Sequence, residues 1–267
     1  MNRTILPFSV LLAVFATATI ADVPAAPAAR TVPLRTESFY DTWLKDRLSI
    51  GLGFSYATLT DSERPKDAQN NRTFIGFVWK LEDTDQIGVL PELRYWAADH
   101  LRLVLALDRV SARTRNYNAE KHSDGVADLW GPQLLVEGVY PLCDETVFLH
   151  AGVGVVYDFA DFNEVNWWKL GYSSKADWEY LGRPSKSRQD YHREIRVDDD
   201  FGWTIAAGVS WRPAPRFELD VSLRHTWINP DCQFGFFHGG SYGFENQLDG
   251  DFDFDHLTIA LTGSYVF

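Results

Sequence analysis

The stretch H-L-T-I-A-L-T-G-S-Y-V-F, residues 256–267, alternates between two kinds of side chain without a break. One row is large and apolar, and the other is small and only mildly polar. Because successive side chains of a strand point to opposite faces, the stretch predicts one β-strand with two unlike faces. The apolar row is Leu257, Ile259, Leu261, Tyr265 and Phe267, and the small row is Thr258, Ala260, Thr262, Ser264 and Val266.

The same alternation recurs in seven earlier stretches. They cover residues 48–56, 89–96, 101–108, 130–140, 147–158, 203–211 and 217–227. In all eight, the middle of the apolar row contains no Asp, Glu, Lys or Arg. A charge on the lipid face of a barrel costs roughly 2–4 kcal/mol near the midplane, so lipid exposure requires this absence. The predicted fold class is all-β, an eight-stranded antiparallel up-and-down transmembrane β-barrel.

The connections between these stretches alternate in length. Short periplasmic turns opposite long extracellular loops are typical of outer-membrane barrels, and an even number of crossings puts both termini in the periplasm. A soluble lipocalin-like barrel would instead place its charges outside and its large apolar residues inside. Short turns are expected at residues 99–100, 143–145 and 213–215, and long connections at residues 60–72, 116–128, 159–199 and 229–250.

Three local features refine this topology. Residues 73–81 also look strand-like, but a ninth crossing would break the arrangement, so we assign them to a protruding hairpin of the first extracellular loop. Pro91 lacks a backbone donor in mid-strand and predicts a bulge or a local break. In the third long loop, Ser174 with Asp177 resembles a capping box, which predicts one or two helical turns that end near Gly182.

The N-terminal region predicts a leader and a linker. Arg3 precedes an apolar run that is too short to span a membrane, and small residues follow it. We therefore expect a signal peptide over residues 1–21, with cleavage after Ala21 or Ala18. We expect residues 22–45 to be a periplasmic linker and lead-in, of which residues 22–35 are Pro/Ala-rich. The lead-in ends in a short helix that either rests at the membrane interface or caps the periplasmic mouth, and the barrel occupies residues 46–267.

The charge of the chain argues against two classes of partner. Without the leader, 24 basic and 37 acidic residues remain, which gives a net charge of about −13. Such a chain is not drawn by electrostatics to nucleic acid or to an anionic membrane surface. We expect no cofactor.

Residues 46–267 resemble the small eight-stranded outer-membrane proteins of the OmpX/OmpW/OmpA-like class. The resemblance rests on the leader, the rhythm of strands and loops, and the ending Gly263, Tyr265, Phe267. This ending is similar to the C-terminal signature that such barrels present to the assembly machinery. The resemblance implies a monomer in the bacterial outer membrane, surrounded by lipid and lipopolysaccharide, whose last strand engages the barrel-assembly machinery.

The inward row predicts what fills the barrel. Eight strands leave an interior just wide enough for side chains, so we expect an ion-paired polar plug and not a water-filled pore. The plug is expected to contain Glu92, Arg94, Arg102, Asp108, Glu137, Asp158, Glu218, Asp220 and Arg224. The ends of the apolar rows predict two aromatic girdles. The outer girdle is Tyr56, Trp130, Tyr157, Trp203 and Trp227, and the inner girdle is Tyr95, Tyr140, Trp211, Phe217, Tyr265 and Phe267.

No catalytic constellation stands out in the sequence. A lipid A deacylase would be indicated by a His-x-Ser pair near a carboxylate, whereas this chain has only His225-Thr226 and His256-Leu257-Thr258. We therefore expect no catalytic residue and a non-enzymatic role in envelope structure or in surface recognition through the aromatic-rich loops. The alternatives are passage of small hydrophobic solutes, as the OmpW-like resemblance implies, and a lipid A-modifying hydrolase.

The acidic rim residues and the two cysteines are expected to have no binding or cross-linking role. Residues 198–200 and the acidic run Asp249, Asp251, Asp253 and Asp255 do not follow the EF-hand pattern, so solvated rim charge is expected and not bound Ca²⁺ or Mg²⁺. Cys143 and Cys232 fall at opposite ends of the predicted barrel, so no disulfide is expected between them.

Overall fold

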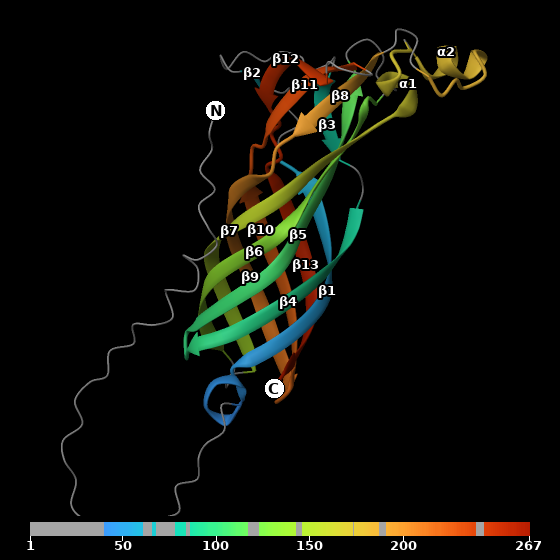
Figure 1. The fold of residues 1–267 in the computed structure, drawn as a ribbon. Coiled ribbons are helices and arrows are strands. Elements are labelled where there is room, and N and C mark those ends of the chain that lie inside the picture. Colours follow the sequence, from blue (N-terminus) through green and yellow to red (C-terminus); the bar gives the residue numbers. More distant parts are fainter. Residues whose placement is uncertain are drawn as a thin grey trace, which may run out of the picture. The chain divides into compact units, whose positions relative to one another are not determined.

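Eight strands close into an antiparallel barrel in the computed structural model (Figure 1). The structure describes residues 40–60, 66–67, 78–83, 86–116, 123–142, 146–172, 174–186, 191–238 and 243–267. This confirms the predicted fold class, because β13 pairs with β1 and so closes the ring. In barrel order the strands are β1 (Leu48–Leu59), β4 (Gln86–Ala98), β5 (Leu101–Asn116), β6 (Gly125–Leu142), β7 (Val147–Glu164), β9 (Asp200–Ala214), β10 (Phe217–Trp227) and β13 (His256–Val266).

The two ends of the barrel differ in their connections. At one end, which we call the turn end, Asp99 and His100 join β4 to β5, and Pro215 and Arg216 join β9 to β10. At the other end, the loop end, the connections from β1 to β4, from β7 to β9 and from β10 to β13 carry further strands or helices. No helix among the described residues is both long enough and apolar enough to cross a membrane.

The N-terminal lead-in is tied to the turn end. The predicted signal peptide and the linker up to residue 39 lie outside the described residues. The expected helix is a single π-helical turn, Tyr40–Leu44, after which the backbone N–H of Asp46 donates to the carbonyl of Phe267 at 2.6 Å. Tyr40 and Trp43 are 43% and 52% exposed, so the turn does not bury its two aromatic rings.

A second sheet of four strands lies at the loop end, where we expected long loops with a hairpin at residues 73–81 and one or two helical turns, but no further sheet. This is a correction. The strands come from three separate connections, so their pairing is not visible in any one stretch of sequence. The irregular pairing of β11 with β12 at Phe234 and Gly235 weakens the alternation further. In sheet order they are β2 (Lys66–Asp67), β12 (Gly243–Asp251), β11 (Asp231–His238) and β8 (Tyr191–Val197).

Two short helices, α1 (Asn166–Lys169) and α2 (Lys175–Tyr180), also belong to the loop end. The predicted cap is confirmed, because the Ser174 hydroxyl accepts a hydrogen bond from the Asp177 backbone N–H at 3.1 Å. The helix ends before Gly182, whose φ of +81° favours glycine.

The strands β5, β6 and β7 run farther than predicted at the loop end. Residues 123–128, expected to be loop, contain the start of β6, and β7 continues to Glu164. These extensions, the second sheet and α1 enclose one apolar core. Its buried members are Leu81, Val110, Ala112, Ala127, Leu129, Val156, Phe162, Trp167, Trp168, Tyr172, Ile195, Ile228, Cys232, Phe252 and Phe254.

Candidate functional site

The outer wall of the barrel is apolar. Leu52, Phe54 and Val153 are 64%, 63% and 62% exposed, and the outward residues of the other barrel strands include many similarly exposed apolar side chains. Soluble monomers rarely expose a continuous apolar surface of this kind. The outer wall therefore has the chemistry of a surface that is covered by lipid.

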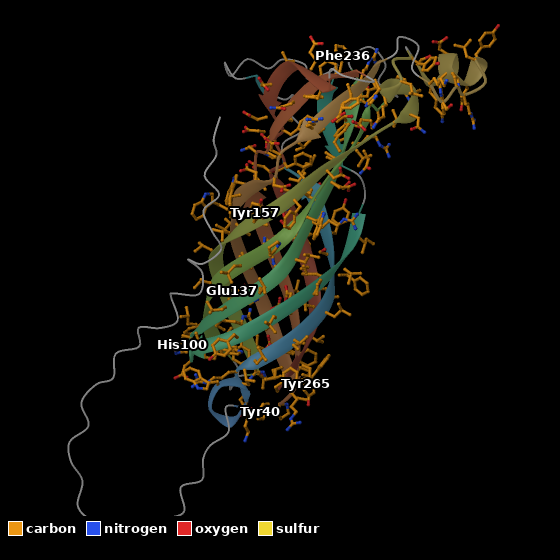
Figure 2. All side chains as sticks on the ribbon, viewed as in Figure 1. Tyr40, His100, Glu137, Tyr157, Phe236 and Tyr265 are labelled. Carbon is orange, nitrogen blue, oxygen red and sulfur yellow. The ribbon has the colours of Figure 1, made fainter. Side chains whose placement is uncertain are left out.

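The predicted girdle residues lie on this outer wall. Tyr157 lies toward the loop end and Tyr265 toward the turn end (Figure 2). Eight of the eleven predicted residues are exposed, and Tyr95, Tyr157 and Phe267 are half-buried. Near the loop end the rings form a continuous arc. The ring centroid of Phe159 lies 5.1 Å from that of Trp130 and 5.2 Å from that of Tyr157, and the Tyr157 centroid lies 4.6 Å from that of Phe201.

The interior of the barrel is polar and charged, whereas its outer wall is apolar. The structure places all nine residues of the predicted plug inside the barrel, with relative exposures of 1% to 5%. They fall into two groups. Seven of them form one ion-paired network, namely Glu92, Arg94, Arg102, Glu137, Glu218, Asp220 and Arg224. The other two are Asp108 and Asp158.

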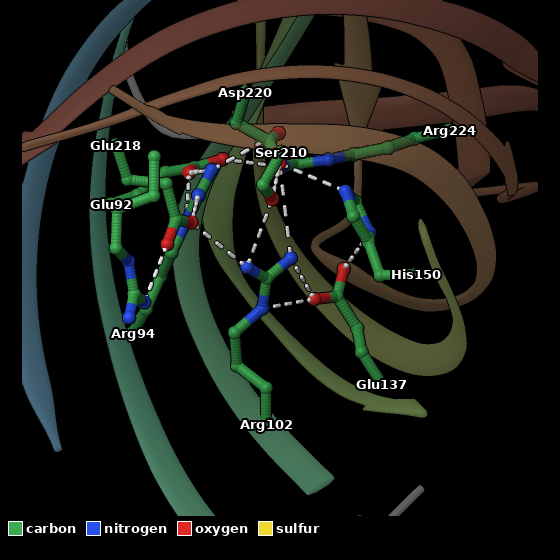
Figure 3. A network of polar contacts seen from close by, with 10 residues as sticks. Glu92, Arg94, Arg102, Glu137, His150, Ser210, Glu218, Asp220 and Arg224 are labelled. Carbon is green, nitrogen blue, oxygen red and sulfur yellow. Dashed lines mark hydrogen bonds and ion pairs between the residues drawn. The ribbon is translucent and has the colours of Figure 1, made fainter. Parts of the chain in front are cut away.

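Arginines hold the network together across the lumen (Figure 3). Arg94 donates to Glu92 of its own strand at 2.5 Å and to Glu218 of β10 at 2.9 Å. Arg102 of β5 lies 2.7 Å from Glu137 of β6 and 3.1 Å from Glu218. Arg224 pairs with Glu92 and donates to the Gln133 side chain at 3.0 Å. Burial of these charges is tolerated because each one is paired and hydrogen-bonded.

His150 is part of this network, although the sequence analysis did not include it. Its Nε2 lies 2.8 Å from Asp220, and its Nδ1 lies 3.4 Å from Glu137. The ring has room because Gly208 is its neighbour on β9, where an added Cβ would lie 2.6 Å from the ring. The signal was present in the sequence, since His150 belongs to the inward row of its strand.

Asp108 and Asp158 belong to a second polar group, next to the apolar core of the loop end. The His256 Nε2 lies 3.1 Å from the Asp108 carboxylate, and its Nδ1 lies 2.8 Å from the Phe254 carbonyl. Asp158 is close enough to interact electrostatically with both side chains. The other histidine considered for catalysis, His225, lies on the outer side, with its ring 4.2 Å from Trp227. The two candidate histidines therefore face opposite sides of the wall and cannot share one site.

Two of the acidic rim residues accept hydrogen bonds from backbone N–H groups. Asp199 accepts from the Ala160 N–H, and Asp255 accepts from the Ile228 N–H, each at 3.0 Å. Within the described part of the chain, no three His, Cys, Asp or Glu side chains are grouped so as to hold a metal ion. Cys232 is buried in the loop-end core, whereas Cys143 lies outside the described residues.

Among the described residues, the ladder between β4 and β5 is interrupted over several residues. β4 pairs with β1 from Gln86 to Tyr95, but its ladder with β5 begins only at Glu92. β3 (Val78–Asp83) pairs with the far end of β5, from Ala112 onward. Between these two ladders, residues 107–111 of β5 have their ladder partners on β6.

The ladder with β5 begins directly after Pro91, which has no N–H to donate, so the predicted break lies on the β5 side, while the ladder with β1 continues through Pro91. The β4 side of the gap is apolar, whereas the β5 side includes the buried Asp108 and the exposed Arg109. Ile87 and Val89 are 78% and 61% exposed on the outer wall, and Leu90 packs inside against Ala106 and Ala260. β3 is not a ninth crossing, since it lies along the extension of β5 beyond the gap. Residues 73–77 lie outside the described residues.

These features define a closed eight-stranded barrel with an apolar wall and a charged interior, the fold of the small outer-membrane β-barrel proteins. The chain is similar to the outer membrane protein OprG from Pseudomonas aeruginosa, with a TM-score of 0.59 and 13% identity over 84% of this chain and 97% of that one. At this identity the likeness concerns the fold alone.

Two other solved structures are more distantly similar. The outer membrane protein AlkL, in lipid bilayers, has a TM-score of 0.49 and 12% identity over 93% of this chain and 97% of that one. The outer membrane protein W of E. coli has a TM-score of 0.45 and 12% identity over 84% of this chain and 99% of that one. No protein-family description and no curated protein matches the sequence.

Proposed function

We propose that the chain is an integral, non-enzymatic protein of the bacterial outer membrane that acts at the cell surface through its loop end. One observation carries this proposal: exposed apolar side chains cover the wall, while the charges are gathered inside. In water this distribution would be strongly unfavourable, whereas in a bilayer both faces are satisfied. The turn end then lies in the periplasm with both termini, and the protein is a monomer whose β13 engages the assembly machinery.

The interior argues against an open diffusion pore. The paired side chains come from β4, β5, β6, β7 and β10 and meet across the lumen (Figure 3). A continuous water column would require several buried ion pairs to separate, and an eight-stranded barrel has no spare width for such a column.

The loop end is suited to recognition because it is preorganised. Its short strands and helices are fixed on an apolar core of large rings, including the fully buried Trp168, Phe252 and Phe254. A rigid surface loses little conformational entropy when it binds a partner. Lipopolysaccharide is the partner that surrounds this end in the proposed location.

The test is refolding of residues 22–267 from urea into detergent micelles and lipid vesicles. We expect a folded monomer with heat-modifiable migration on gels, and no steady ion channels in planar bilayers. A protein that folds and stays monomeric in plain buffer would contradict the membrane assignment. Stable ion channels would contradict the proposal that paired side chains close the lumen.

The gap between β4 and β5 supports a second candidate function, lateral passage of small apolar molecules between the barrel interior and the bilayer. Among the described residues, the ladder between β4 and β5 is interrupted there, so two neighbouring wall strands are not joined along their whole length. Ile87, Val89 and Leu90 on the β4 side of the gap are apolar and suit contact with an apolar solute.

A matched pair of variants tests this route. Val89→Trp places a bulky ring at the outer edge of the gap, and Val153→Trp places the same ring on β7, at a site of nearly equal exposure (61% against 62%). We expect Val89→Trp to slow the entry of a short-chain hydrocarbon into cells or vesicles carrying the protein, while Val153→Trp matches the wild type. Equal rates for all three proteins would eliminate lateral passage at this site.

A further inference from the structure

A cavity of about 390 Å³ opens between α1 and α2 at the loop end. Leu170, Trp178 and Pro184 form its apolar wall. Asn166, Lys169, Arg183 and Ser185 supply its polar groups. The volume lies at the lower end of the range for small-molecule sites, which suits one or two sugar rings.

The chain around the cavity is fixed by specific contacts. The Trp178 indole Nε1–H donates to the Pro184 carbonyl at 2.9 Å, and the Tyr172 hydroxyl donates to the Lys186 carbonyl at 3.3 Å. Arg183 has a φ of +55°, an uncommon conformation for a residue with a Cβ. In the turn after α2, the Arg183 guanidinium lies over the Trp178 ring, 6.0 Å from its centroid.

The lining combines two kinds of chemistry. An indole and two aliphatic residues match the apolar C–H face of a pyranose, and amide, hydroxyl and cationic groups match its polar rim. Lys169 is paired with Glu164 at 3.1 Å, and Arg183 with Glu179 at 2.9 Å. These contacts position the two cations and leave most of their N–H donors available to a ligand.

The charged side chains that line the cavity are both basic. Lys169 and Arg183 belong to the lining, whereas their partners Glu164 and Glu179 do not. An anion inside the cavity therefore lies close to two cations. The lining favours an acidic ligand over a neutral one.

We propose that this cavity binds an acidic saccharide, a pyranose that carries a carboxylate or a phosphate group. The proposal rests on the surface role proposed for the loop end and names its ligand class. Trp178, Leu170 and Pro184 contact the apolar side of the sugar, and Lys169 and Arg183 bind the anionic group. Carboxylated sugars occur in extracellular polysaccharides and phosphorylated sugars in lipopolysaccharide, so the two anions distinguish two sources.

The experiment is isothermal titration calorimetry, with saturation-transfer NMR, on the full mature chain folded in micelles. The probes are glucuronate, glucose 6-phosphate and glucose. We expect at least one acidic sugar to bind and glucose to bind about tenfold more weakly or not at all. The stronger of the two acidic probes indicates the source.

Three variants locate the site. Trp178→Ala and the double variant Lys169→Gln/Arg183→Gln are expected to weaken binding about tenfold or more. Lys175→Gln removes a basic residue of α2 that does not line the cavity, and is expected to leave binding unchanged. No saturable binding, equal binding of glucose, or insensitivity to the cavity variants would each overturn the proposal. Gel mobility and conductance do not depend on this cavity, so they report separately on the barrel itself.

Discussion

Replacement of Arg102 by methionine tests whether the network in the lumen is held by charge pairing. Arg102 is 1% exposed, and its guanidinium lies 2.7 Å from Glu137 and 3.1 Å from Glu218. Methionine fills similar space but carries no charge and no donor. The variant therefore leaves carboxylates behind in the interior with fewer partners.

The expected loss of unfolding free energy follows from the contacts that remain in the variant. Glu218 keeps Arg94 at 2.9 Å and Arg212 at 3.0 Å, whereas Glu137 keeps only His150, at 3.4 Å. Most of the cost therefore falls on Glu137. Removal of one partner from a buried ion pair costs about 3–5 kcal/mol of unfolding free energy. Replacement of both partners by apolar residues of similar size is often close to neutral, so Arg102→Met/Glu137→Leu is expected to lose much less.

The assay is equilibrium urea unfolding in lipid vesicles, followed by tryptophan fluorescence and checked for reversibility. With a slope near 2 kcal/mol/M, the single variant should unfold at a urea concentration about 2 M lower than the wild type. The double variant should recover most of this shift. A single variant within about 0.5 kcal/mol of the wild type would refute the reasoning, and so would a double variant less stable than the single one.

Three further predictions test other parts of the structure. Gly208→Ala should destabilise the barrel because its Cβ would lie 2.6 Å from the His150 ring, whereas Gly138→Ala, whose Cβ meets nothing nearer than 3.8 Å, should not; equal unfolding midpoints would count against this packing. Burial and the nearby Asp251 and Asp231 carboxylates raise the pKa of the Cys232 thiol, so little thiolate exists at neutral pH. In a Cys143→Ser background, maleimide should label Cys232 slowly until the protein is unfolded, and rapid labelling of the folded protein would contradict its burial. Leu261→Arg on the outer wall should cost roughly 2–4 kcal/mol in a bilayer, while Tyr180→Arg, at an 89% exposed site of the loop end, should be neutral; similar costs would mean that the wall does not face lipid.

Much of the barrel was predictable because period-two alternation is a local property. It assigned Leu261 to the wall and Thr262 to the lumen, and the structure agrees, with Leu261 54% exposed and Thr262 fully buried. It also placed the inward charges, although it could not say which ones meet. Pairs such as Arg94 with Glu218 depend on the curvature and closure of the whole ring.

The loop end was not predictable in the same way. Phe234 pairs with Leu248 on one side and Ile195 on the other, and these partners come from different connections. Aromatic residues, glycines and acids are mixed in these stretches, so composition alone indicated loops. The gap beside Pro91 was foreseen as a break, but its length depends on where β3 joins β5, which only the three-dimensional structure shows.

The pairing of β1 with β13 has a consequence for how the protein is made. Ser49 and Val266 are ladder partners although more than two hundred residues separate them. Contacts this distant in sequence form late, because the entropy of bringing the segments together is lost before the contact compensates for it. Until then the unpaired edges of β1 and β13 expose backbone hydrogen-bonding groups and apolar side chains to water. The chain therefore passes through an unclosed stage in which these strands are prone to aggregate.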